Sequence, residues 1–163
     1  MEYKDLQTVF ESENIRYVKL SELLVTDYTN MVNDLENVGR QIGRKSTVTE
    51  DDELKWVRGK LEENAPIFSM LEKKSSAFIG NIEIMDVKDR EGELGIAITA
   101  DKQDMGYGTE AIPAFIRYMK EHFGLKRIFL KVYPDNVRAI HVYKKCGFTE
   151  YDRTDEDIFM EVT

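Results

Sequence analysis

Two hydrophobic periods run along this chain, and their order predicts a mixed fold. Apolar residues at every third or fourth position predict helices. Short β-branched and aromatic runs, separated by charged or glycine-containing turns, predict strands. Helices are expected to begin near residues 26, 49, 108 and 136, and strands to cover 15–20, 65–71, 77–87, 93–99, 127–133, 149–151 and 158–162. This order suits one α+β domain with a mixed, mostly antiparallel sheet and about four flanking helices.

Local signals refine the helices. Thr49 and Asp52 have the spacing of a capping box, which predicts the start of the second helix. The fourth helix is expected to be capped by Asp135 or Asn136. Pro113 falls in the second turn of the third helix, where its ring is expected to cause slight strain. The predicted buried face of the second helix consists of Leu54, Val57 and Leu61.

A glycine-containing loop joins an apolar strand to the third helix. Gly106 and Gly108 open this helix, where backbone N–H groups lack helical partners and an anion can approach closely. With Ala111, the two glycines also fit the dinucleotide fingerprint G-x-G-x-x-A. That fingerprint belongs at the first strand of a repeated βαβ array, whereas only one strand–helix pair follows here. The residues alone leave a phosphate site and a simple tight turn equally open.

Two motifs together resemble the GNAT N-acetyltransferase superfamily. The run Gln103-Asp104-Met105-Gly106-Tyr107-Gly108 is similar to that family's acetyl-CoA loop. The second block is similar to the family's N-x-x-A-x-x-x-Y-x-x-x-G-F and contains Asn136, Ala139, Tyr143, Gly147 and Phe148. The likeness covers roughly residue 14 to the C-terminus, and points to the branch of ribosomal-protein and spermidine N-acetyltransferases. It implies a GNAT-like sheet with splayed central strands.

The resemblance implies acetyl-CoA as co-substrate and a way of holding it. The loop N–H groups would surround the pyrophosphate, and the pantetheine arm would pair with the preceding strand as an added strand does. The N–H of Ile98 would face the thioester oxygen as negative charge develops on it. The implied cofactor-binding residues are Ile96, Ala97, Ile98, Gln103, Asp104, Met105, Gly106, Tyr107, Gly108, Thr109, Asn136 and Tyr143.

Three side chains are candidate catalytic residues. By the resemblance, Tyr143 is the general acid that protonates the coenzyme A thiolate, although taken alone it would be a tyrosine at the edge of a core. The general base is Glu83 or Glu93, which lie on neighbouring predicted strands and could act directly or through water. Either carboxylate could equally be a surface residue, and some family members use water alone. His122 and His141 are weaker candidates for the base.

Composition excludes several classes of protein. A chain of 163 residues suits a single domain over residues 1–163, with 1–14 as an arm or edge segment. The net charge of −8 disfavours a nucleic-acid partner, and no signal peptide or membrane-length apolar run is expected. The single cysteine, Cys146, fits a reducing cytoplasm and would pack beside Gly147. Histidine and cysteine are too scattered to predict a metal site.

The expected acceptor is a primary amine on a small molecule or peptide, such as a polyamine, an N-terminal amine or an aminoglycoside. Acidic residues of the first two helices and the last hairpin could attract such a cation, or could simply form a solvated surface. These are Glu36, Glu50, Asp51, Asp52, Asp155, Glu156 and Asp157. A non-catalytic acetyl-CoA-binding or sensing module, and a dinucleotide-binding domain, are the alternative functions. The sequence leaves the acceptor, the base and the oligomeric state open, a homodimer being one option.

Overall fold

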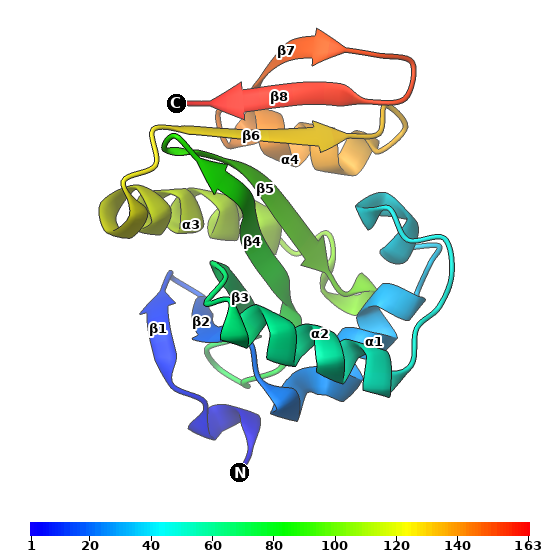
Figure 1. Ribbon diagram of the computed structural model, residues 1–163, viewed down its shortest axis with the longest axis vertical. Helices are drawn as coiled ribbons and strands as arrows, with labels where there is room; N and C mark the ends of the chain where they lie inside the picture. The colour runs from blue at the N-terminus through cyan, green and yellow to red at the C-terminus, as the bar shows by residue number, and fades with distance from the viewer. The chain divides into compact units, whose positions relative to one another are not determined.

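The computed structural model describes residues 1–163, which form two compact units. The first comprises Met1–Glu83 and Ile96–Tyr107, and the second comprises Ile84–Gly95 and Gly108–Thr163. Eight strands pair in the order β1-β2-β3-β4-β5-β6-β8-β7 (Figure 1). The pair β5–β6 is parallel, and the pairs β1–β2, β2–β3, β3–β4, β6–β8 and β7–β8 are antiparallel. The predicted α+β class, with a mostly antiparallel sheet and four α-helices, is confirmed.

The first unit contains two helices and the antiparallel strands from β1 to β4. Arg16 of β2 holds the N-terminal segment, because its guanidinium donates to the carbonyl oxygens of Leu6 at 2.7 Å and Tyr3 at 2.5 Å. Residues 1–14 contain an edge strand, because β1 lies at one end of the sheet order. The strands and helices of the first unit are β1 (Thr8–Glu11), β2 (Ile15–Lys19), α1 (Val25–Asn33), α2 (Glu50–Glu62) and β3 (Ile67–Glu72). The unit also contains the start of β4 (Phe78–Lys88) and the end of β5 (Glu91–Ile98). Its 3-10 helices are η1 (Tyr3–Asp5), η2 (Glu22–Leu24), η3 (Gly39–Ile42) and η4 (Ala100–Lys102).

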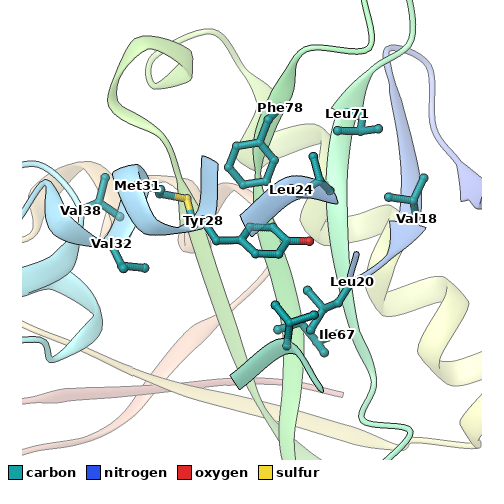
Figure 2. Close-up of a cluster of buried hydrophobic side chains, with 11 residues drawn as sticks. Val18, Leu20, Leu24, Tyr28, Met31, Val32, Val38, Ile67, Leu71 and Phe78 are labelled. Carbon is teal, nitrogen blue, oxygen red and sulfur yellow. The ribbon is translucent and has the colours of Figure 1, made fainter. Parts of the chain in front are cut away.

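Apolar side chains from α1, α2, β2 and β3 form the core of this unit (Figure 2). Tyr28 lies in the middle of the cluster, and Phe78 packs edge-on against its ring at 5.6 Å between centroids. Met31 and Val32, one turn further along α1, are also buried, as their helical spacing predicts. Ala97 of β5 packs against the same cluster, which fixes the face of the sheet that Ala97 occupies.

Helix α2 begins as predicted, but its buried face differs from the prediction. The Thr49 hydroxyl accepts a bond from the Asp52 N–H at 3.1 Å, and the Asp52 carboxylate accepts one from the Thr49 N–H at 3.0 Å. Leu61 is exposed, whereas Glu53 is buried. The Arg44 guanidinium lies 3.3 Å from the Glu53 carboxylate, so an ion pair compensates for the buried charge.

The second unit contains α3 (Tyr107–Phe123, from Gly108 onward), β6 (Arg127–Val132), α4 (Val137–Lys145), β7 (Thr149–Arg153) and β8 (Ile158–Val162). Helix α3 runs unbroken through Pro113 and begins one residue before the predicted start. The predicted apolar face of α3 is buried apart from Phe123, which is exposed at the helix end. The core of this unit includes Leu94, Ile112, Phe115, Met119, Leu130, Phe148 and Met160.

The parallel pairing of β5 with β6 is short. It joins residues 91–93 of β5 to residues 127–129 of β6. Leu94 and Gly95 continue β5 without a partner on β6. The two strands thus leave their ladder early, which is the separation that splayed central strands require. Unpaired strand backbone of this kind can bind an extended ligand.

Candidate active site

The predicted glycine loop contains two residues with positive φ immediately before α3. Asp104 has a φ of +62° and Gly106 a φ of +86°. Helix α3 then starts at Tyr107 and continues for 17 residues. Met105 and Gly106 are exposed, and their backbone N–H groups have no acceptor within the protein. A long helix preceded by open N–H groups provides the partial positive charge and the donors that bind a phosphate group.

A buried carboxylate anchors both ends of this loop. Glu72, the last residue of β3, accepts bonds from the Tyr107 hydroxyl and from Lys102 Nζ at 3.3 Å. Its other oxygen accepts from the Ser75 hydroxyl at 2.6 Å. The Ser75 and Tyr107 hydroxyls, followed by Lys102, hold the pKa of Glu72 down at about 2 despite its burial. Glu72 therefore stays ionised and fixes the side chain that stands between the two loop glycines.

Gln103 connects the loop to the end of β5. Its side-chain nitrogen donates to the carbonyl oxygen of Ile98 at 2.9 Å and to that of Asn37 at 3.2 Å. The sequence placed Gln103 among the cofactor-binding residues, and the structure gives its amide nitrogen a role in holding the loop against β5. The position of the loop is thus tied to the strand that precedes it.

The end of β5 remains accessible although β5 is a central strand. Ile96, Ala97 and Ile98 are each only half-buried. The neighbouring strand approaches closely here, because a Cβ on Gly80 would lie 1.9 Å from the carbonyl oxygen of Ala97. Position 80 therefore requires glycine. Without a side chain there, β4 lies close to the end of β5 that is predicted to bind the cofactor.

Helix α4 carries the second motif and has no fully buried residue. Asn136 caps it, as predicted, by accepting a bond from the Ala139 N–H at 3.3 Å. Tyr143 is half-buried, and its ring contacts Phe148 at 5.9 Å between centroids. Burial, with a smaller effect from Cys146, raises the pKa of Tyr143 to about 12. The hydroxyl therefore keeps its proton at neutral pH and can donate it.

The C-terminal end of α4 meets the first turn of α3. Pro113 has no N–H, so the carbonyl oxygen of Thr109, four residues earlier, lacks its helical donor. The Cys146 thiol lies 3.9 Å from that oxygen and donates to it. Burial raises the pKa of Cys146, which keeps the thiol protonated for this bond. The carbonyl oxygen that Pro113 leaves without a helical donor thus has a donor from the end of another helix, at a residue predicted only to pack.

The two candidate bases lie in different surroundings. Glu83 is half-buried on β4 in the first unit, and pairs across the ladder with Ile67 of β3. Glu93 belongs to the second unit, and burial raises the pKa of its carboxyl group while the charge of Lys131 lowers it. Strand alternation places Glu83 and Asn81 on one face of β4. Ser69 and Asn81, which the sequence did not single out, form part of a buried polar chain on that face.

No group of three or more His, Cys, Asp and Glu side chains converges to form a metal site. None of the helices combines the length and apolar character needed to cross a membrane.

Two of the acidic residues proposed for substrate attraction have hydrogen-bond partners within the protein: Glu50 accepts from the Thr26 hydroxyl at 2.5 Å, and Asp52 caps α2.

Residues 14–149 match the family model described as an acetyltransferase (GNAT) domain. This chain therefore belongs to the GNAT acetyltransferase family, whose members use acetyl-CoA. The match includes the glycine loop, the strand before it and helix α4, and gives no support to the dinucleotide-binding alternative.

Similar proteins include a spermidine N(1)-acetyltransferase of Vibrio cholerae, 29% identical over 67% of this chain and 65% of that protein. The alignment thus spans just under two thirds of that relative's length. Among solved structures, the V. cholerae spermidine N-acetyltransferase with CoA and spermine has a TM-score of 0.83 at 20% identity, over 91% of this chain and 95% of that chain. A V. cholerae structure assigned as a ribosomal-protein-serine acetyltransferase has a TM-score of 0.78 at 18% identity, over 97% of both chains. These structures share the fold, as the resemblance to this branch predicted.

Proposed function

We infer that this protein is an N-acetyltransferase that moves the acetyl group of acetyl-CoA directly to a primary amine in a ternary complex. One observation carries the proposal: open backbone N–H groups precede helix α3 in a chain that belongs to the GNAT family. The loop residues Asp104, Met105, Gly106, Tyr107, Gly108 and Thr109, with Gln103 holding the loop, would take the pyrophosphate. Ile96, Ala97 and Ile98 would pair with pantetheine, and Asn136 and Tyr143 would contact its thiol end.

Each chemical step has a candidate residue. Glu83 is the first choice for the base, because it shares a face of β4 with Asn81 in the unit that contains residues 96–98; Glu93 is the second. The base removes a proton from the ammonium group, so that the amine nitrogen can attack the thioester carbon. The Ile98 N–H donates to the carbonyl oxygen as negative charge develops there. The new C–N bond leaves a positive charge on the nitrogen, which loses its second proton to solvent as the C–S bond breaks. Tyr143 gives its proton to the departing sulfur and regains one from solvent.

The acceptor is proposed to be a cationic or N-terminal amine, either a small molecule or a peptide. Polyamine-acetylating relatives and the net charge of −8 support this choice. A single domain over residues 1–163 is proposed because the family match spans residues of both units. Cytoplasmic location and a homodimer stay predictions.

A panel of amines with detection of released coenzyme A tests the function. Spermidine, an aminoglycoside, free amino acids and N-terminal peptides should be compared at low and physiological salt. Release that depends on a primary amine supports acetyl transfer. Binding of acetyl-CoA without release for any amine would instead support a non-catalytic sensing module. If electrostatic attraction contributes, KM for spermidine should rise with salt.

A further inference from the structure

A chain of buried hydrogen bonds crosses from helix α1 to strand β4 in the first unit. The Tyr28 hydroxyl lies 2.5 Å from Ser69 Oγ, and Ser69 Oγ lies 2.8 Å from Asn81 Oδ1. Tyr28 and Ser69 have no exposed surface, and Asn81 is 8% exposed. Polar groups in such a position require satisfied bonds, because an unpaired buried hydroxyl costs about 1–3 kcal/mol.

The direction of this chain is fixed at its first member. The backbone N–H of Ser21 donates to the Tyr28 hydroxyl oxygen at 3.2 Å, and an N–H cannot accept. Burial raises the pKa of Tyr28 to about 12, so its own proton is present and is donated to Ser69. Ser69 then donates to Asn81 Oδ1. The reverse direction would leave a buried hydroxyl proton without an acceptor.

This direction sets the orientation of the Asn81 carboxamide. Its oxygen is engaged by Ser69, so the group that Asn81 presents elsewhere is its NH₂. No buried side-chain nitrogen or oxygen lacks a hydrogen-bond partner, so this nitrogen, which has no acceptor in the protein, reaches the surface. Ser69 is the direct partner of Asn81 on β3. Because the amide oxygen is directed toward Ser69 of β3, the nitrogen lies on the side of the carboxamide away from Ser69.

The residue of β5 opposite Asn81 belongs to the predicted cofactor strand. The Thr99 N–H bonds to the Ile79 carbonyl oxygen at 2.9 Å, and this antiparallel register places Asn81 across from Ala97. Ala97 packs against the cluster that surrounds Tyr28, so it shares the face of Tyr28 and Ser69. Glu83 lies two residues beyond Asn81 on that face. An NH₂ donor and a carboxylate thus lie beside the half-buried residues 96–98.

Given the proposed acetyltransferase function, we propose that Asn81 selects the acceptor by donating a hydrogen bond to an oxygen close to the reacting amine. The acceptor class is then an amine with a neighbouring carbonyl or hydroxyl, such as an N-terminal aminoacyl group or an amino sugar. A plain alkyl polyamine offers only N–H donors and cationic nitrogens, and would leave the Asn81 NH₂ unpaired. A site built to bond a substrate oxygen discriminates against analogues that lack it.

The test compares two variants on two kinds of acceptor. Asn81→Leu removes both polar atoms, and Asn81→Asp keeps an acceptor for Ser69 while removing the NH₂. If Asn81→Leu does not fold, Asn81→Asp still tests the proposal. Glycinamide and glucosamine carry an oxygen near the amine, whereas propylamine and spermidine do not. Dissociation constants for acetyl-CoA and melting temperatures report whether the fold and cofactor site are intact.

For both variants, kcat/KM for glycinamide or glucosamine should fall by about 10–100-fold, the equivalent of one unpaired buried group. The value for propylamine should stay within about threefold, and spermidine should be unchanged or improved by the added charge of Asn81→Asp. Equal losses on all four amines, or wild-type preference for spermidine that neither variant alters, would overturn the proposal and leave acetyl transfer standing. If the wild type releases no coenzyme A with any amine, the proposed function itself fails.

Discussion

The hydroxyl of Tyr107 donates a hydrogen bond to the carboxylate of Glu72, a residue 35 positions earlier in the chain. Tyr107 stands between the two glycines of the loop that resembles the family's acetyl-CoA loop. Tyr107 is buried, and its hydroxyl is held by the ionised carboxylate of Glu72. The glycines provide conformational freedom, and this bond restricts the freedom to one loop shape. The two effects together pre-organise the loop that is proposed to bind phosphate.

Tyr107→Phe should weaken acetyl-CoA binding more than it weakens the fold. Loss of the hydroxyl leaves part of the Glu72 charge unpaired and lets the loop move, at a cost of about 1–3 kcal/mol. Tyr3→Phe is the matched control, because it removes a tyrosine–carboxylate bond to Asp27 of 2.6 Å in the same unit. Calorimetric titration of both variants should show lower affinity only for Tyr107→Phe. Equal affinities would confine Tyr107 to a structural role.

The ionised state of Glu72 also predicts a pH dependence of stability. Its pKa is lowered in the folded protein from 4.5 to about 2, so its bonds stabilise the fold fully above about pH 4.5. This stabilisation is lost as the pH falls from 4.5 toward 2, where the folded carboxylate becomes protonated. The difference in the free energy of unfolding between wild type and Glu72→Gln should therefore shrink over that range. Urea unfolding at a series of pH values measures it; a constant difference would contradict the assignment.

Two glycines with the same φ allow an effect on folding to be separated from an effect on binding. Gly106 and Gly43 both have a φ of +86°, and a Cβ on either would meet no atom within 4 Å. Alanine at each position should therefore cost a similar amount of stability, about 1 kcal/mol, through backbone strain. Only Gly106→Ala should also reduce acetyl-CoA affinity and the ligand-induced rise in melting temperature. If both variants bind alike, the loop is only a turn.

Tyr143→Phe should keep acetyl-CoA affinity and lose turnover. The change removes the proton donor but retains the ring that contacts Phe148. Loss of a general acid typically lowers the rate by about 10²–10⁴-fold. Tyr151→Phe, at an exposed position of the same unit, serves as the control. Wild-type turnover of Tyr143→Phe across the pH range would exclude the acid role.

The two carboxylate candidates differ in what their removal should do. Glu83→Gln should lower kcat by about 10²–10⁴-fold and remove the acidic limb of the pH–rate profile, because the base must be deprotonated. Glu93→Gln should keep that limb. Because the pKa of Glu93 is raised in the folded protein, its ionised form destabilises the fold above the unfolded pKa, and Glu93→Gln should slightly raise stability at neutral pH. The opposite kinetic pattern would assign the base to Glu93.

Local signals in the sequence were sufficient for the elements and for the family. The capping box at Thr49, the cap at Asn136 and the apolar periods of α1 and α3 act between residues a few positions apart, so they can be read directly. The same holds for the glycine loop and for the second motif, whose spacing places it on one helix. These features predicted the α+β fold, the family and the cofactor correctly.

The groups that shape the site depend on long-range contacts, and only the tertiary structure identified them. Glu72, Ser69 and Asn81 are ordinary polar residues of strands in the sequence, and the partners that connect them to other elements lie 12 to 41 positions away. The bond of Cys146 to Thr109 likewise depends on the meeting of two helices. Whether a carboxylate on a strand is solvated, paired or buried follows from which segments the fold brings together, and no local pattern encodes that information. The sequence therefore determined the secondary-structure elements, the family and the co-substrate, and the fold decided which side chains hold the loop and helix α4 in place.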